Sequence, residues 1–255
     1  MHSRAIQLAA LALCSLASTQ ASSQTDEIQV YDGGIAGRGV LNLTWHNNYV
    51  FEGSGHAGFP GGLVANHLLS GVTEWALGVR PWMEAGLYLP LYSLAPDGTL
   101  TANGFKLRAL FVSPDSAYRE FFYGINFEFS YNAQHWDTSR LSQEIRPIVG
   151  WHMGAWDVVI NPILDNSYKG IGNLDFAPAS RIAFHAGKTW TFAVEEYDNF
   201  GPLSSFYASD RQTHQAFAAV DYAGPVWEVE AGAGFGLNDA SDRLTLKLIL
   251  SRNLD

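Results

Sequence analysis

Cysteine is almost absent from this 255-residue sequence, in which Cys14 is the single example. One cysteine cannot form a disulfide within the chain, so a disulfide-stabilised scaffold is excluded. Charge is also scarce, because Asp, Glu, Lys and Arg make up 16% of the residues while aromatic residues make up 13%. A disordered chain carries more charge and fewer aromatic residues. The composition therefore indicates a folded protein.

Basic residues are in short supply. The chain has 15 Lys and Arg against 25 Asp and Glu, which gives a formal net charge of -10. Proteins that bind nucleic acid need a basic surplus to displace counterions from the phosphate backbone. We therefore expect no nucleic-acid partner.

Long apolar runs are missing as well. The longest stretch, residues 5–17, is interrupted by Gln7 and Ser15, and it is shorter than the roughly 20 residues of a spanning helix. Arg4 precedes this stretch, and small residues around Ala21 follow it. This pattern predicts a cleaved secretory signal peptide over residues 1–21, and Cys14 would leave with it.

Hydrophobicity alternates with a period of two residues in several segments. Between residues 121 and 131, one face carries Phe121, Tyr123, Ile125, Phe127, Phe129 and Tyr131. The other face carries small or polar residues, among them Asn126 and Glu128. This period is that of a β-strand with two different faces, whereas a helix would repeat every 3.6 residues.

The whole chain gives about twelve such strand candidates, each near the ~10 residues that a tilted strand needs to cross a bilayer. They begin near Val40, Leu69, Trp82, Gly104, Phe121, Glu144, Trp156, Ala177, Thr189, Gln215, Val226 and Arg243. We therefore predict an all-β fold.

The connections between the candidates alternate in length. We expect long connections at 53–66, 93–103, 132–141, 164–176 and 199–213, and short ones at 80–81, 113–118, 153–155, 186–188 and 223–225. Outer-membrane barrels have long loops outside and short turns on the periplasmic side. We predict an antiparallel up-and-down transmembrane β-barrel of about 12 strands over residues 40–255, with a soluble periplasmic β-protein as the rival interpretation.

Aromatic residues fit a barrel that meets lipid. Tryptophans lie at or near strand ends or within strands, at positions 45, 75, 82, 151, 156, 190 and 227. Rings near strand ends would form interfacial girdles. Ordinary core packing is the alternative for each of them.

The predicted register turns charged residues of both signs toward the lumen. They are Glu84, Lys106, Arg108, Glu128, Glu144, Arg146, Arg181, Glu195, Glu228, Glu230 and Lys247. Such charges either form a network of ion pairs or line a hydrated passage. A lumen of mixed charge favours small neutral or apolar solutes, so the predicted function is an outer-membrane channel or transporter.

Signals for catalysis are weak. The histidines are scattered without the spacing of a metal site, and we expect no metal, no cofactor and no catalytic residue. Glu228 and Glu230 could form a catalytic pair of carboxylates, but acidic residues facing the lumen recur in any polar barrel interior. His214 follows Asp210 in an expected outer loop, which leaves an outer-membrane hydrolase as an alternative function. A structural barrel with a plugged lumen is a second alternative.

Residues 22–39 precede the first predicted strand. This segment is acidic at Asp26 and Glu27 and then rich in glycine. Chain termini are commonly poorly ordered, which favours a periplasmic tail. The other interpretation is a small plug within the barrel.

Several segments resemble a known family. These are Asp26–Asp32 (DEIQVYD), Leu41–Tyr49 (LNLTWHNNY), Glu74–Val79 (EWALGV) and Glu84–Pro90 (EAGLYLP). Together they are similar to a group of proteobacterial outer-membrane β-barrel proteins, like the transporter-like barrels associated with the meta-pathway of phenol degradation. The resemblance implies an outer-membrane location, passage of small or apolar compounds, and partners that include membrane lipid and the barrel-assembly machinery. It transfers no catalytic residue.

Overall fold

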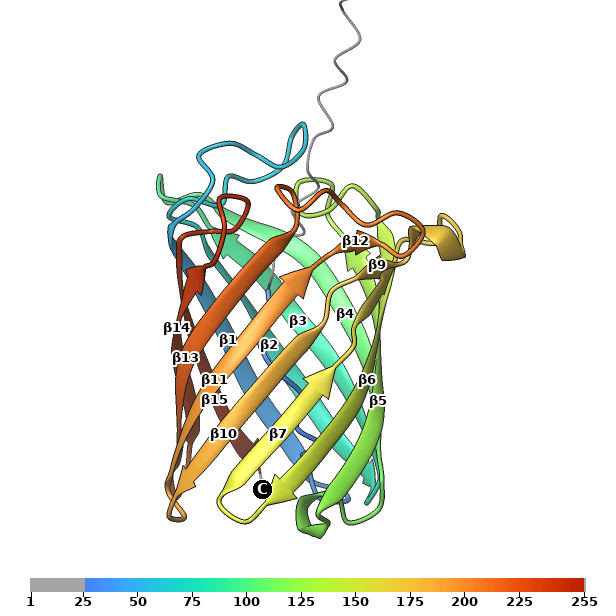
Figure 1. Cartoon of the computed structure of the whole chain (residues 1–255), viewed down its shortest axis with the longest axis vertical. Helices are drawn as coiled ribbons and strands as arrows, with labels where there is room; N and C mark the ends of the chain where they lie inside the picture. The colour runs from blue at the N-terminus through green and yellow to red at the C-terminus, as the bar shows by residue number, and fades with distance from the viewer. Residues whose placement is uncertain (1–25, 255) are drawn as a thin grey trace, which may run out of the picture.

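The computed structural model describes residues 26–254, and the signal peptide predicted for residues 1–21 lies outside this range. The chain forms a closed barrel of twelve long antiparallel strands (Figure 1). Within residues 26–254, no helix has the length and apolar character needed to cross a membrane.

The twelve long strands follow one another around the barrel in chain order. They are β1 (Leu41–Glu52), β2 (Leu69–Arg80), β3 (Met83–Leu94), β4 (Leu100–Val112), β5 (Phe121–Asn132), β6 (Leu141–Met153), β7 (Trp156–Asn161), β10 (Ala179–Ala186), β11 (Trp190–Asn199), β13 (Thr213–Ala223), β14 (Glu228–Gly236) and β15 (Leu244–Leu254). Pairing of β1 with β15 closes the sheet, so neither strand is left as an open edge.

The predicted all-β barrel is confirmed. The strands begin within four residues of the predicted positions, and the largest difference is at β4, which begins at Leu100 rather than Gly104. Short strands β8 (Leu164–Asn166), β9 (Asp175–Phe176) and β12 (Gly201–Pro202) extend the wall above β7, β10 and β11. Two short 3-10 helices, η1 (Ser116–Tyr118) and η2 (Ile171–Asn173), lie in connections.

The two ends of the barrel differ. At the loop end, shown at the top of Figure 1, the connections include residues 53–68, 162–178 and 200–212. At the opposite turn end, where residue 254 lies, β2 and β3 are joined by residues 81–82 and β6 and β7 by residues 154–155. The loop end therefore carries most of the irregular chain.

One part of the expected alternation is wrong. The connection predicted as long at 93–103 is the five-residue turn 95–99, and the connection after β4, predicted as shorter, spans residues 113–120 and contains η1. In the tight turn, Asp97 Oδ1 accepts the Thr99 N–H at 2.9 Å, and Gly98 has a φ of 87°. An Asp-Gly pair stabilises such a turn, so β3 and β4 extend further than the hydrophobic pattern indicated.

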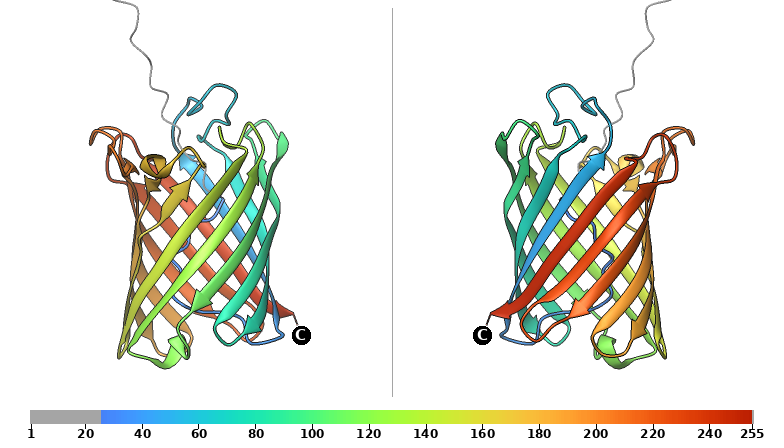
Figure 2. Two further views of the ribbon diagram at one scale, coloured as in Figure 1. Left: turned by 90° about the vertical axis from the view of Figure 1, so that its right-hand side faces the viewer. Right: turned by 90° about the vertical axis from the view of Figure 1, so that its left-hand side faces the viewer.

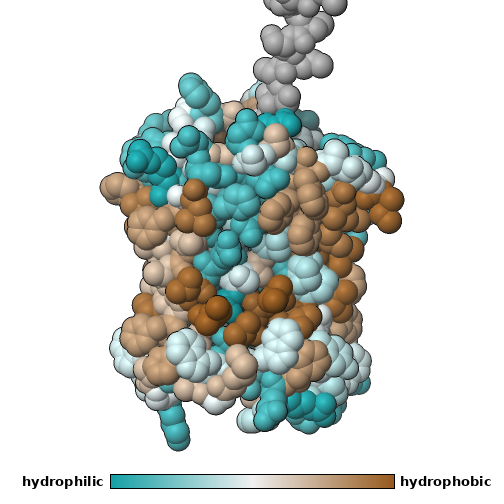
Figure 3. Space-filling model, viewed as in Figure 1, coloured by the Kyte–Doolittle hydropathy of each residue, from teal (hydrophilic) through white to brown (hydrophobic). Residues whose placement is uncertain are grey.

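The wall has an apolar outer face and an inner face of different character. In β15, Leu246 and Leu248 are 40% and 39% exposed, whereas Lys247 and Ile249, which alternate with them, are buried. The seven tryptophans noted in the sequence are all exposed. On the face drawn in Figure 3, apolar residues gather over the lower wall and the sides, and hydrophilic residues lie at both ends and down the upper middle. Exposed large apolar side chains occur on eleven of the twelve long strands, all except β13.

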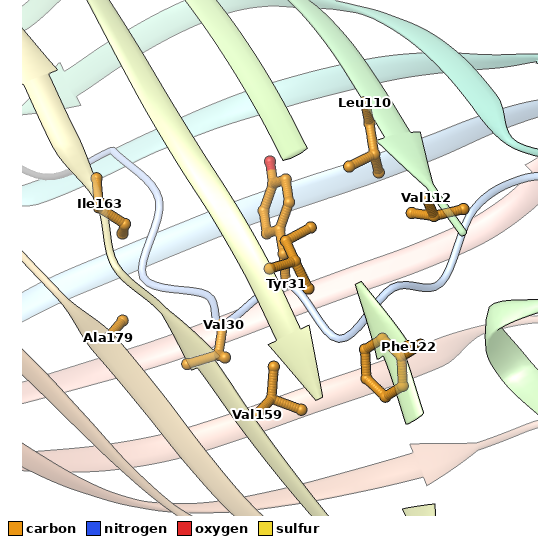
Figure 4. Packing of buried hydrophobic residues seen from close by; sticks show 9 residues of the cluster. Val30, Tyr31, Leu110, Val112, Phe122, Val159, Ile163 and Ala179 are labelled. Atoms are coloured by element: carbon orange, nitrogen blue, oxygen red, sulfur yellow. The ribbon is translucent and has the colours of Figure 1, made fainter. Parts of the chain in front are cut away.

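The chain before β1 lies inside the barrel. Residues 26–39, called here the N-terminal segment, run along the lumen to the turn end, where β1 begins (Figure 2). The described part of residues 22–39 therefore lies within the lumen. Its Val30 and Tyr31 belong to an apolar cluster inside the barrel (Figure 4), together with Leu110, Val112, Phe122, Ile148, Val159, Ile163 and Ala179.

Candidate functional site

The N-terminal segment is fixed to the barrel wall through Tyr31. The Tyr31 N–H donates to Asn161 Oδ1 at 2.7 Å, and Asn161 Nδ2 donates to the Tyr31 carbonyl at 3.0 Å. The Tyr31 hydroxyl lies 2.7 Å from that of Tyr88 and donates to Glu128 Oε1 at 3.1 Å. These bonds join the segment to β7, β3 and β5.

An arginine on β4 organises the lumen beside Tyr31. Arg108 forms ion pairs with Glu84 and, at 2.7 Å, with Glu74. It also donates to the Tyr31 hydroxyl at 3.1 Å. Glu84 in turn accepts the Ala36 N–H at 2.6 Å. Both charged partners of Arg108 are buried, so the network replaces the water that these groups have lost.

A second arginine and a lysine hold the start of the segment. Lys106 pairs with Asp26 at 2.8 Å and with Glu128 at 3.5 Å. Arg146 donates to Glu144 at 2.6 and 3.1 Å and to the Gln29 carbonyl at 2.9 Å.

Glu27 also belongs to this group, but it is poorly satisfied. Arg146 lies 3.7 Å from its carboxylate, beyond hydrogen-bonding distance. Neither carboxylate oxygen accepts a hydrogen bond within the described chain, and the residue is 6% exposed. Burial, together with repulsion from Glu128, raises the pKa of the Glu27 carboxyl above its ordinary value.

A third network covers the side of the lumen formed by β10 to β15. Arg181 pairs with Glu195 and Asp221, and Lys247 pairs with Glu195 and Glu230. Lys247 also donates to the Ile28 carbonyl at 3.3 Å. The N-terminal segment therefore contacts this side of the wall as well.

The residues predicted to line the lumen fall into these networks, with one exception. The networks contain Glu84, Lys106, Arg108, Glu128, Glu144, Arg146, Arg181, Glu195, Glu230 and Lys247. Glu228 instead is exposed at the turn-end start of β14. Of the two arrangements left open by the sequence, the described charges show ion pairing.

Sequence reasoning missed other participants. Glu74 of β2 is buried and pairs with Arg108, and Asp221 pairs with Arg181. The alternation in β2 contained the signal, because exposed Trp75 and Leu77 turn Glu74 inward. His46, also missed, is fully buried 3.3 Å from Glu74. Among residues 26–254, no three histidine, cysteine or acidic side chains are placed to hold a metal.

A cavity of about 420 Å³ lies above the N-terminal segment and is called here the vestibule. Residues 26–29 line it from below, and loop-end residues such as Asp137, Lys169 and Arg211 line it from above. Its lining holds eight acidic and four basic side chains. The vestibule therefore has a net negative charge.

Three carboxylates form a row along one wall of the vestibule. In the strand register, Glu144 of β6 faces Asp165 of β8, and Asp165 faces Asp175 of β9. All three line the cavity. Like charges directly opposite on neighbouring strands repel each other. Only Glu144 has a basic partner at hydrogen-bonding distance, Arg146, among the ion pairs of the described chain.

His214 and Asp210, the loop residues considered from the sequence, do not pair with each other in the described structure. His214 Nδ1 lies 2.6 Å from Asp198 Oδ1. The histidine therefore pairs with Asp198 and not with Asp210. The Ser241 hydroxyl accepts the backbone N–H of His214 and donates to Asn238, so it is not bonded to the imidazole ring. Within residues 26–254, Ser241 is therefore not placed as a nucleophile activated by the His214 ring.

Solved structures of similar shape exist, although their sequences are distant. An outer-membrane channel from Pseudomonas putida F1 has a TM-score of 0.60 and 12% identity, covering 89% of this chain and 100% of that one. The NanC porin has a TM-score of 0.55 and 9% identity, covering 84% and 100%. No protein-family model and no curated protein matches the sequence. At these identities the likeness establishes that the chain has the same fold, a closed antiparallel barrel, as these two proteins.

Proposed function

We propose that this protein is an outer-membrane channel or transporter for small solutes. The observation that carries the proposal is a closed barrel with an apolar outer face, a charged inner face and a vestibule at the loop end. A closed barrel satisfies every backbone group of its wall, which lipid requires. The loop end would face the outside of the cell and the turn end the periplasm.

The N-terminal segment narrows the path that a solute would take. Tyr31 crosses from β7 to β3 and β5 at the level of the paired charges. Solutes would collect in the vestibule and pass beside this segment or after its displacement. Ion pairs of both signs line the middle of the lumen, which fits the small neutral or apolar solutes expected from the sequence. The net negative vestibule disfavours anions.

Planar-bilayer recording tests the proposal. Residues 22–255, refolded in detergent and inserted, are expected to give discrete conductance steps that become severalfold larger when residues 22–38 are removed. The exposed loop substitution Asp210→Asn is the control and is expected to leave the steps unchanged. If the correctly folded barrel conducts neither with residues 22–38 nor without them, the result would contradict the proposal and favour a structural role.

A further inference from the structure

Basic groups are too few for the acids around the start of the N-terminal segment. Lys106 serves both Asp26 and Glu128, and Arg146 serves both Glu27 and Glu144. Two cations thus face four carboxylates. Asp165 and Asp175 add two more acids to the same cavity without an ion pair among the described residues.

Two of these carboxylates are buried with unused hydrogen-bonding capacity. Glu27 is 6% exposed and accepts no hydrogen bond from residues 26–254 at either oxygen, and Asp26 Oδ2 likewise has no partner within that range. Both residues line the vestibule. Buried charges are normally paired, and an acceptor without a donor costs folding free energy. Such acceptors are ready for a ligand that brings positive charge and N–H groups.

The lining of the cavity indicates what kind of cation fits. Its volume of about 420 Å³ is that of a small-molecule pocket and much larger than a metal ion. Phe59, Trp136 and Ile163 add apolar surface to the lining. A metal would use none of this surface, and no group of three potential metal ligands converges in residues 26–254.

We propose that the vestibule binds a small organic cation, a protonated amine recognised by Glu27 and by the row of Glu144, Asp165 and Asp175. Its apolar body would lie against Phe59 and Trp136, where the aromatic faces also attract positive charge. The role of this site in uptake depends on the proposed channel function. Binding itself does not, because the cavity exists whether or not the barrel conducts.

Three ligands of matched shape test the site on folded residues 22–255 in detergent. Benzylammonium carries a positive charge, benzyl alcohol none and benzoate a negative charge. Isothermal titration is expected to show saturable binding of benzylammonium, at least about tenfold weaker binding of benzyl alcohol, and no binding of benzoate. Binding should weaken as salt concentration rises.

Substitutions locate the site. Glu27→Gln and Asp165→Asn are each expected to weaken benzylammonium binding about tenfold. Asp210→Asn removes the same charge from an exposed loop outside the cavity and should leave binding unchanged. Circular dichroism and the heat-dependent gel shift identify variants that still form the barrel, and only these are compared.

Several results would overturn the proposal. Equal binding of benzyl alcohol would show that charge is not recognised. Saturable calcium binding that excludes benzylammonium would identify a metal site instead. Absence of binding by a barrel that conducts would refute the cation site alone, with Glu27 neutralised by its own proton. Binding by a barrel that does not conduct would refute the channel and leave the site intact.

Discussion

Asn161 pairs with the backbone of Tyr31 as a neighbouring β-strand would. Its side-chain carbonyl accepts the Tyr31 N–H at 2.7 Å, and its amide donates to the Tyr31 carbonyl at 3.0 Å. Both groups are buried, so one side chain satisfies the donor and the acceptor of a residue that belongs to no strand. The pair fixes the N-terminal segment to β7.

The first prediction follows from this pair. Asn161→Leu leaves a buried N–H and a buried carbonyl without partners, at a cost of about 1–3 kcal/mol. We expect faster amide hydrogen exchange at residues 28–32 and an unchanged exchange rate in β15. Asn161→Asp keeps the acceptor but sets a buried carboxylate oxygen against the Tyr31 carbonyl, so its effect should be at least as large. Exchange as slow as in the unmodified protein would show that the segment is held by its other contacts.

The second prediction concerns access from the loop end. Residues 22–255 contain no cysteine, so a single introduced thiol can be labelled selectively. Gln29 lines the vestibule, and we expect a methanethiosulfonate reagent added on the loop side to react with Gln29→Cys and to reduce the single-channel current by more than half. Leu203→Cys, in an exposed loop position, should react without changing the current. Reaction of Gln29→Cys from the turn side alone would place the constriction above residue 29.

The third prediction tests the outer face. Leu107 is 50% exposed on β4, and its register partners Leu87 and Phe129 lie near the middle of β3 and β5. In a bilayer, Leu107→Arg is expected to destabilise the folded barrel by about 2–4 kcal/mol, measured by urea titration in lipid vesicles. Leu100→Arg, at the loop end of the same strand, should cost about 0–1 kcal/mol. Equal costs at both positions would mean that this face does not meet hydrocarbon.

The fourth prediction concerns pH. Because burial raises the pKa of Glu27, the folded barrel holds this proton more tightly than the unfolded chain, whose carboxyl has the ordinary value of 4.5. Folding stability from this group is therefore present below pH 4.5 and is lost as the pH rises through the folded-state pKa. As the pH rises from 4.5 to the folded-state pKa, the free energy of unfolding of Glu27→Gln should therefore increase relative to that of the unmodified protein. Urea titrations at several pH values measure the difference, and a constant difference would contradict the raised pKa.

The wall was far more predictable than its contents. Alternation such as that of residues 121–131 requires only that one face meet an apolar medium, and this local rule locates strands. The long connection predicted at 93–103 is wrong because an Asp-Gly pair, here Asp97 and Gly98, is itself a signal for a tight turn.

The contents of the lumen depend on contacts between distant residues. Asp26 meets Lys106, and Tyr31 meets Asn161, across separations of 80 and 130 residues. No local pattern encodes such pairs. A partial signal was present in the apolar alternation of Ile28 and Val30, both of which are buried and would be unusual in a solvated tail.

The pairing of β1 with β15 has a consequence for the order of assembly. Lys247, which donates to the Ile28 carbonyl, belongs to the last strand of the chain, whereas the side chains that hold Tyr31 and Gln29 belong to β3, β4, β5, β6 and β7. The surface that holds the first described residues is therefore completed only when the final strand has joined the first. The N-terminal segment would then bind fully only after β1 has paired with β15. In a barrel that has not yet closed, the N-terminal segment would remain accessible to protease.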